Sequence, residues 1–365
     1  MEKKHIIGLS EIMFALLLFL IGSSVIWGIS LTAEKNSWVA SLIAGVIGLL
    51  LFHMFVYIWR NNNFQNLALI LNENLGKHVG FVVSVVYVLY FAYLASRVLS
   101  DLTFFINGKL LYTMPPFFVK CSIFLIIVYT YLKGMEAFIR SAVIWGTITL
   151  LFLLILPLMI FFSGSFNWEY VEPIFSFNFN KIAESIPTMI AFPFSEIIAF
   201  LMIFPFLKRK DRGGVSKKGS IIIIIFTVLM SIFSFLIIGV LHPLLAKNYT
   251  FPFITTIERV TVFDFIERLD IFAVILFIIG GYFKIAVFTF ASIHLARESI
   301  TRMNLKFLAL SILVLIFLSS YPFSENIAQH LQVGLEVIPA IIHLPLGVLL
   351  PMLVFIITII KRTKA

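Results

Sequence analysis

Long apolar runs separated by short polar segments are the dominant pattern of this chain. Ten runs approach the roughly 20 residues that a helix needs to cross a ~30 Å hydrocarbon core. The predicted spans are approximately 9–30, 37–59, 80–106, 115–132, 141–163, 183–207, 220–246, 264–293, 305–321 and 335–360. Hydropathy therefore predicts an all-α polytopic membrane protein with a single ten-helix domain over residues 1–365.

The ten spans divide into two sets of five, at about 9–163 and 183–360. Because five is odd, the second set would enter the membrane in the opposite orientation to the first. The first span of each set is interrupted, by Gly-Ser-Ser at 22–24 and by Pro-Phe-Ser-Glu at 193–196. Either break alone would suit ordinary helix packing. Breaks at matching positions of two halves instead favour a 5+5 inverted repeat that binds a ligand at broken helices 1 and 6.

Several charged residues fall inside the predicted spans, where each costs roughly 2.5–3.5 kcal/mol on insertion scales. Glu196 should therefore face protein, water or a ligand, and it could pair with Lys284. Lys284 has no partner within its own span, because Asp270 lies 14 residues away, or about 21 Å of helix rise. Arg97 and Asp101 are four residues apart on one helical face and can pair with each other. That pair could lock helix packing or belong to a site.

The breaks suggest how a ligand would be held. Unwound backbone is tolerated at membrane depth only where it lines a cavity or contacts protein. The half-helix after Ser195 presents its positive end, which suits an anionic group such as an amino acid carboxylate. Glu196 could accept an ammonium or hydroxyl group. The predicted ligand-binding residues are Gly22, Ser23, Ser24, Tyr93, Arg97, Phe192, Phe194, Ser195, Glu196, Gly281, Lys284 and Phe288.

Composition and charge add the orientation and exclude other classes. Hydrophobic residues form 61% of the chain, and the mean hydropathy is +1.07. With the amino terminus in the cytoplasm, eighteen of the 27 Lys and Arg lie on the cytoplasmic side and six on the other. This asymmetry predicts that both termini are cytoplasmic. The basic loop 208–218 satisfies this rule and could touch anionic lipid, so the net charge of +9 requires no nucleic-acid partner.

Enzyme and metal signatures are not apparent in the sequence. It contains no phosphate-binding loop, nucleophile elbow or metal-spaced Cys/His set. The lone Cys121 excludes an intramolecular disulfide. We therefore expect no catalytic residue, metal site or cofactor.

The chain resembles the B subunit of GerA-type spore germinant receptors, in the amino acid–polyamine–organocation transporter superfamily. The resemblance covers nearly the whole length and rests on the motifs at 134–140 (GMEAFIR), 193–196 (PFSE) and 266–270 (IERLD). Two departures stand out: the family usually has glycine where Ser195 stands, and often tryptophan near 280–281. Both would alter the pocket, so ligand identity does not carry over.

The resemblance implies a LeuT-like fold in the inner membrane of a bacterial spore. It also implies a nutrient-sensing subunit that acts with a larger A-type membrane subunit and a C-type lipoprotein, in contact with membrane lipid. The alternative is a proton-coupled secondary amino acid transporter, in which Lys284 or Glu196 exchanges a proton. A structural membrane protein without a ligand would leave the paired breaks and buried charges unexplained.

Overall fold

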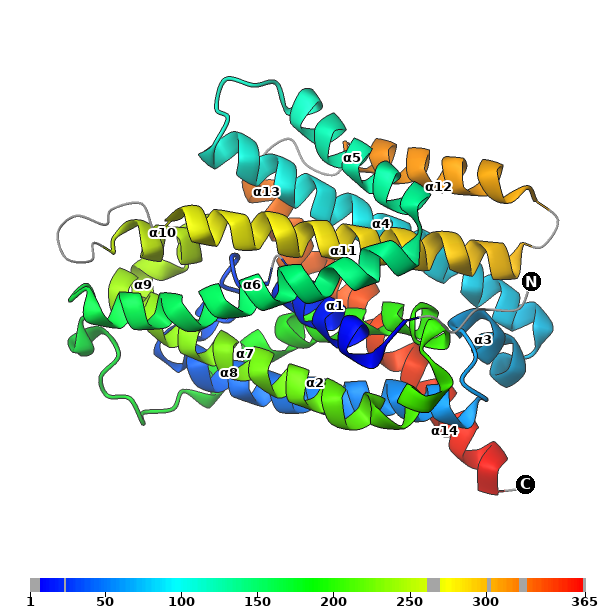
Figure 1. Ribbon diagram of the computed structural model, residues 1–365. Coiled ribbons are helices and arrows are strands. Elements are labelled where there is room, and N and C mark those ends of the chain that lie inside the picture. Colours follow the sequence, from blue (N-terminus) through cyan, green and yellow to red (C-terminus); the bar gives the residue numbers. More distant parts are fainter. Residues whose placement is uncertain (1–6, 23, 261–269, 301–302, 322–326, 364–365) are drawn as a thin grey trace.

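A computed structural model describes residues 7–22, 24–260, 270–300, 303–321 and 327–363 of the chain. These residues form a bundle of roughly parallel and antiparallel helices (Figure 1). In the described part of the chain, eight helices are long and apolar enough to cross a membrane. Two shorter apolar helices, Leu9–Ile21 and Leu305–Ser319, complete the pattern. The ten predicted spans all correspond to one of these helical segments.

The helix bounds follow most of the predicted spans to within a few residues, but the first helix ends at Ile21 rather than at 30 and the last span begins at Ile327 rather than at 335. The spans are formed by α1 (Leu9–Ile21), α2 (Ser37–Asn61), α4 (Lys77–Lys109), α5 (Pro116–Lys133), α6 (Met135–Phe162), α7 (Phe179–Met189) with η3 (Ile190–Phe194) and η4 (Ser195–Met202), α8 (Val215–Leu241), α11 (Asp270–Ser299), α12 (Leu305–Ser319), and α13 (Ile327–Gln332) with η7 (Val333–Val337), η8 (Pro339–His343), η9 (Pro345–Leu349) and α14 (Leu350–Thr363). Short elements between them are η1 (Leu31–Asn36), α3 (Leu67–Leu75), η2 (Trp168–Tyr170), η5 (Phe204–Phe206), η6 (Arg209–Gly214), α9 (Pro243–Ala246) and α10 (Pro252–Glu258).

Glycines and asparagine caps set several of the helix ends. Gly76 and Gly134 take positive φ values of 83° and 91° between consecutive helices, a conformation that glycine adopts without a Cβ penalty. The Asn66 side chain accepts a hydrogen bond from Leu69 N at the start of α3, and Asn304 accepts one from Lys306 N at the start of α12. Such caps satisfy backbone donors that the first turn leaves free.

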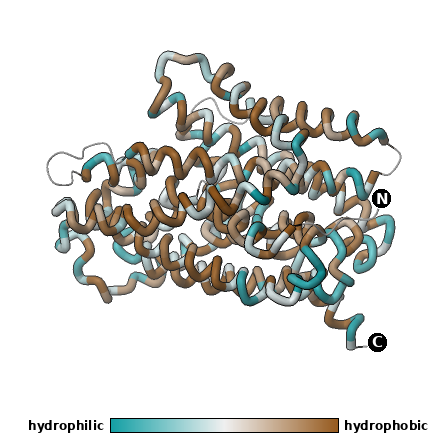
Figure 2. Tube along the Cα trace, in the orientation of Figure 1, coloured by the Kyte–Doolittle hydropathy of each residue, from teal (hydrophilic) through white to brown (hydrophobic). Residues whose placement is uncertain are grey.

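Hydrophilic residues gather toward the two ends of the bundle, and hydrophobic residues fill its length (Figure 2). The described chain begins and ends near α3 and α14, whereas α9 and α10 lie at the opposite end (Figure 1). α5 and α12 run along one edge, and α5 carries exposed apolar side chains such as Leu125 and Leu132. An apolar exterior is what contact with lipid requires.

The shortest span lies at the centre. Ten of the thirteen residues of α1 are buried, and α1 packs against α6, α8 and α11. α11 also lies along α4 over much of its length. This packing places α4, α11 and the interrupted helices around one central region.

Candidate functional site

The break in the first span lies at the end of α1. Gly22 caps the helix with φ 19° and ψ −120°, values outside the helical region. The Ser24 hydroxyl donates to the carbonyl of Leu20 and, at 3.1 Å, to that of Ile21. These are among the carbonyl groups that a helix end leaves without partners. Ser24 therefore stabilises the broken end, and the predicted neighbour Ser23 lies outside the described residues.

The break in the sixth span lies at Phe192. Its backbone is extended, with φ −140° and ψ 112°, directly before Pro193. Proline lacks the N–H that a continuous helix would use and disfavours helical backbone in the preceding residue. The helix resumes at η4, where the Ser195 hydroxyl donates to Ala191 O at 2.7 Å. The predicted interruption of this span is confirmed.

Lys284 of α11 joins the two breaks. A Cβ added to Gly22 would lie 2.9 Å from Lys284 Cδ, and one added to Gly280 would lie 2.8 Å from Gly22 Cα. The two glycines thus let α11 approach the end of α1 closely. The Lys284 side chain passes Gly22 and ends 2.6 Å from Glu196 Oε2, on the far side of the second break. We call these two residues the Lys284–Glu196 pair.

The environment of the pair is strongly apolar. The side chains of Lys284 and Glu196 are 0% and 1% exposed. The ammonium lies 3.7 Å from the ring centroid of Phe192 and 5.4 Å from that of Phe19. Within the described part of the chain, neither Lys284 Nζ nor Glu196 Oε2 makes a hydrogen bond of standard geometry. Buried ion pairs are weak stabilisers unless further hydrogen bonds satisfy them, so folding stability alone does not account for this pair.

A small cavity lies beside the second break. Its volume is about 40 Å³, enough for roughly three water molecules at 10–15 Å³ each. The lining residues are Trp27, Tyr93, Leu94, Arg97, Val98, Asp101, Phe192, Glu196, Leu331, Gly334, Leu335 and His343. Four predicted site residues, Tyr93, Arg97, Phe192 and Glu196, therefore meet at one cavity.

A larger vestibule of about 670 Å³ adjoins the cavity on the side of α9 and α10. It is lined by Thr32, Glu184, Lys247, Tyr249, Gln332 and Glu336, among others. Trp27, Leu331 and Leu335 line both spaces. These three apolar side chains therefore form the partition between cavity and vestibule.

Four other predicted residues do not line the cavity, namely Phe194, Ser195, Gly281 and Phe288. Phe194 packs on Phe226, at 5.7 Å between ring centroids, and its ring faces Gly48. A Cβ on Gly281 would lie 2.8 Å from the Leu102 side chain, so Gly281 permits close packing of α4 on α11. Phe288 is fully buried in the core. These residues, like Ser195 against Gly347, shape the walls around the site and do not line the cavity.

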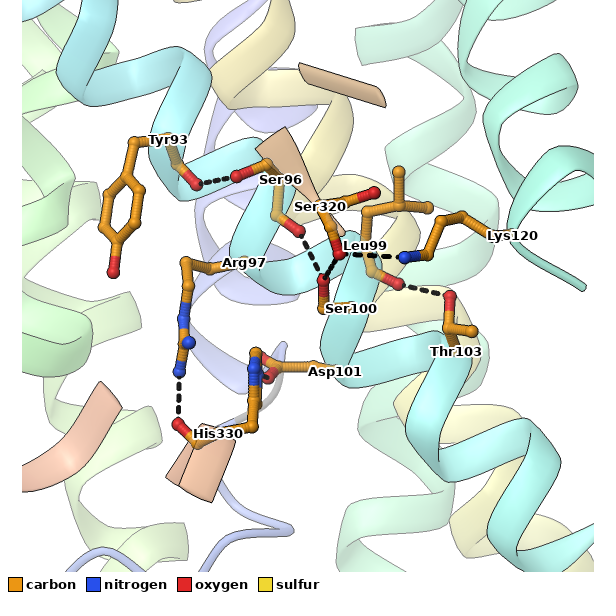
Figure 3. Close-up of polar contacts among 10 residues, drawn as sticks. All are labelled: Tyr93, Ser96, Arg97, Leu99, Ser100, Asp101, Thr103, Lys120, Ser320 and His330. Carbon is orange, nitrogen blue, oxygen red and sulfur yellow. Dashed lines mark hydrogen bonds and ion pairs between the residues drawn. The ribbon is translucent and has the colours of Figure 1, made fainter. Parts of the chain in front are cut away.

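Two polar residues of α4 bind α13 rather than each other. Asp101 Oδ1 lies 2.6 Å from His330 Nε2, and Arg97 Nη2 donates to His330 O at 2.6 Å. Figure 3 marks the contact between Arg97 and the His330 carbonyl and shows the Asp101 side chain beside the His330 ring. The prediction of an Arg97–Asp101 pair is wrong in the described structure, because a partner from the last span competes for both side chains.

The same helix holds the end of α12. Ser320 O accepts hydrogen bonds from Ser100 Oγ at 3.0 Å and from Lys120 Nζ at 2.8 Å (Figure 3). Lys120 Nζ also lies 3.8 Å from the ring centroid of Tyr321. The chain is thus attached to α4 and α5 at Ser320, where the ninth span ends. It is attached to α4 again at His330, in the tenth span.

Sequence reasoning missed Trp27, His330 and His343 as residues of this region. His330 precedes the predicted tenth span, which begins in the structure at α13 rather than at 335. Its position before a proline-rich apolar run was a usable signal. Trp27 lies five residues after the first break and could have been selected as an aromatic neighbour of it.

Comparisons with known proteins agree with this architecture. The family described as "Spore germination protein" matches residues 7–328. Spore germination protein KB of Bacillus subtilis (strain 168) is 30% identical over 371 residues, covering 100% of this chain and 97% of that protein. The predicted spore-germination resemblance is thereby confirmed.

Two solved structures are similar in fold. A Na⁺-coupled sialic acid symporter in a substrate-bound outward-open state has a TM-score of 0.68 at 11% identity, covering 98% of this chain and 90% of that one. MhsT in complex with L-phenylalanine has a TM-score of 0.61 at 12% identity, covering 96% and 97%. The predicted LeuT-like fold with broken helices 1 and 6 is therefore confirmed, while the repeat boundaries 9–163 and 183–360 stay a prediction. By family match and by a relative along its whole length, this membrane protein belongs to the spore germination protein family.

Proposed function

We propose that the chain is the nutrient-germinant-sensing subunit of a spore germinant receptor. It would bind a small, amino acid-like ligand at the breaks of the first and sixth spans. The observation that carries this proposal is the Lys284–Glu196 pair, which links the two breaks. Its Nζ and Oε2 atoms lie 2.6 Å apart. A buried ion pair with so few other hydrogen bonds costs folding free energy, and intramembrane charges of this kind mark functional sites.

The breaks explain how binding would be transmitted. Glu196 lines the cavity while its Oε2 faces Lys284. A ligand ammonium or hydroxyl group in the cavity would compete for this carboxylate and weaken its hold on Lys284. The arrangement of α1, η4 and α11 would then change. A ligand can shift such a balance only by the difference in its affinity for the two arrangements.

The receptor role extends to partners and location. We propose an A-type membrane subunit and a C-type lipoprotein as partners, and the inner spore membrane as the location, with both termini cytoplasmic. The similarity to spore germination protein KB supports a germination role. The charge asymmetry of the loops supports the orientation.

A second candidate function is proton-coupled transport of an amino acid. It is favoured by the burial of an ionisable lysine 2.6 Å from a buried carboxylate, and by the transporters among the fold neighbours. Uptake by the purified chain in liposomes separates the two. Accumulation driven by a proton gradient would favour transport, and binding without accumulation would favour sensing.

Ligand-induced thermal stabilisation tests the sensing proposal. The purified protein is heated with a panel of L-amino acids, sugars and nucleosides, since a ligand that binds only the folded state raises its apparent stability. We expect at least one compound to stabilise the wild type and to lose this effect in Glu196→Gln and Lys284→Met. Lys120→Met is the matched control, because Lys120 is a buried lysine that belongs to neither break and donates to Ser320 O. Equal stabilisation of all variants would refute the site, and none in the wild type would refute this ligand class.

A further inference from the structure

The wall between cavity and vestibule is held in place by α4. Two of its three shared side chains, Leu331 and Leu335, come from α13 and η7. The neighbouring His330 is bound to Asp101 through its ring and to Arg97 through its carbonyl. The position of α13, which carries Leu331, therefore depends on these two α4 side chains, and Figure 3 shows them beside His330.

Arg97 is only half used by this contact. Its Nη2 donates to His330 O at 2.6 Å, whereas its Nη1 is buried without a hydrogen-bond partner among the described residues. Arg97 lines the cavity. A guanidinium has five N–H donors in a planar arrangement that matches a carboxylate. A buried donor without an acceptor costs free energy.

The backbone opposite Arg97 is shaped for the guanidinium. A Cβ added to Gly334 would collide with Arg97 Nη2. Glycine at this position of η7 therefore leaves the space that the guanidinium occupies, next to the carbonyl that it binds. The two carboxylates that line the cavity face other partners: Asp101 Oδ1 faces His330 Nε2, and Glu196 Oε2 faces Lys284.

We propose that Arg97 binds an anionic group of the ligand with Nη1 and thereby couples the ligand to α13. This inference rests on the proposed ligand site and assigns its anion-binding residue. A carboxylate would accept a hydrogen bond from Nη1 and so orient the guanidinium, whose Nη2 donates to His330 O. Ligand binding would then stabilise Leu331 and Leu335 in the position that they have between the cavity and the vestibule. Glu196, on the same cavity, would take the cationic end of a zwitterion.

The test compares variants that alter Arg97 in different ways. Arg97→Gln removes the charge, Arg97→Lys keeps the charge without the fork, and Gly334→Ala keeps Arg97 but displaces its guanidinium. The most stabilising compound of the panel is measured beside its carboxamide, which lacks the anionic group. We expect the apparent Kd to rise about 10-fold or more in Arg97→Gln and Gly334→Ala, with a smaller rise in Arg97→Lys. The carboxamide should bind weakly to the wild type.

A second readout follows α13 itself. In a Cys121→Ser background, Leu331→Cys is modified with a maleimide, and the compound should slow modification only when Arg97 is intact. Unchanged affinity in Arg97→Gln or equal binding of the carboxamide would overturn this inference and leave the proposed function standing. A panel in which only neutral sugars bind would overturn both this inference and the amino acid-like ligand of the proposed function. No stabilisation of the wild type by any compound would refute both.

Discussion

Removing the ammonium of Lys284 should destabilise the protein by leaving Glu196 buried alone. We consider Lys284→Met, because methionine keeps most of the stem that packs against Gly22 and adds no polar group. Both members of the pair are essentially unexposed. Bulk water therefore cannot replace the lost partner, and only the small cavity that Glu196 lines could supply a water molecule.

The size of the effect can be bounded. Breaking a buried pair by removing one partner typically costs about 3–5 kcal/mol. The carboxyl can escape part of this by taking up a proton, and protonating a carboxyl of ordinary pKa 4.3 costs about 3.7 kcal/mol at pH 7. The same step costs about 1 kcal/mol at pH 5. The defect of Lys284→Met relative to wild type should therefore shrink as the pH falls.

A double-mutant cycle measures the effect. Apparent melting temperatures of wild type, Lys284→Met, Glu196→Gln and the double variant are recorded in detergent at pH 7 and pH 5, at a single scan rate because membrane proteins often unfold irreversibly. We expect both single variants to melt lower at pH 7 and the double variant to recover, since two neutral groups leave no lone charge. Additive losses, or a Lys284→Met defect that grows at pH 5, would refute the reasoning.

Three further substitutions test the packing around the site. Gly280→Ala should destabilise the fold by roughly 1–3 kcal/mol through overpacking, because the added Cβ would lie 2.8 Å from Gly22 Cα. The melting temperature should therefore fall, and an unchanged temperature would contradict this. Phe192→Leu should weaken the Lys284–Glu196 coupling measured in the cycle, because the aromatic face 3.7 Å from the ammonium contributes up to about 2 kcal/mol. Asp101→Leu should cost about 1–3 kcal/mol of stability and speed proteolysis of α13, because it removes the carboxylate that lies 2.6 Å from the buried His330 Nε2; unaltered cleavage would contradict this.

The span pattern could be predicted from sequence because it depends on local composition. Hydrocarbon excludes unpaired backbone polar groups, so each apolar run must form a helix whatever its neighbours are. The broken helices were also local signals, since Pro193 and the Gly-Ser run disrupt a helix by their own chemistry. The approach of Lys284 to Glu196 was foreseen as one option because few groups at that depth could serve either charge.

Side-chain partners between distant helices could not be predicted. Arg97 and Asp101 satisfy the i,i+4 rule, but His330 from the last span competes successfully for both. Phe194 and Phe288 fall near the site along the sequence, yet their rings pack on Phe226 and on Phe19 and Phe91 of neighbouring helices. Helical periodicity gives the face of a residue, whereas the helix that covers this face depends on the packing of the bundle.

The sequence by itself determined a helical membrane protein with ten apolar segments, two interrupted helices and a few charges that must find partners in the bundle. These properties arise from the free energy of single residues in hydrocarbon and from backbone chemistry within one turn. The tertiary structure decided which charges meet, where the cavity lies and which side chains separate it from the vestibule. Those features join residues more than 80 positions apart, such as Glu196 and Lys284, and they exist only when the helices pack together.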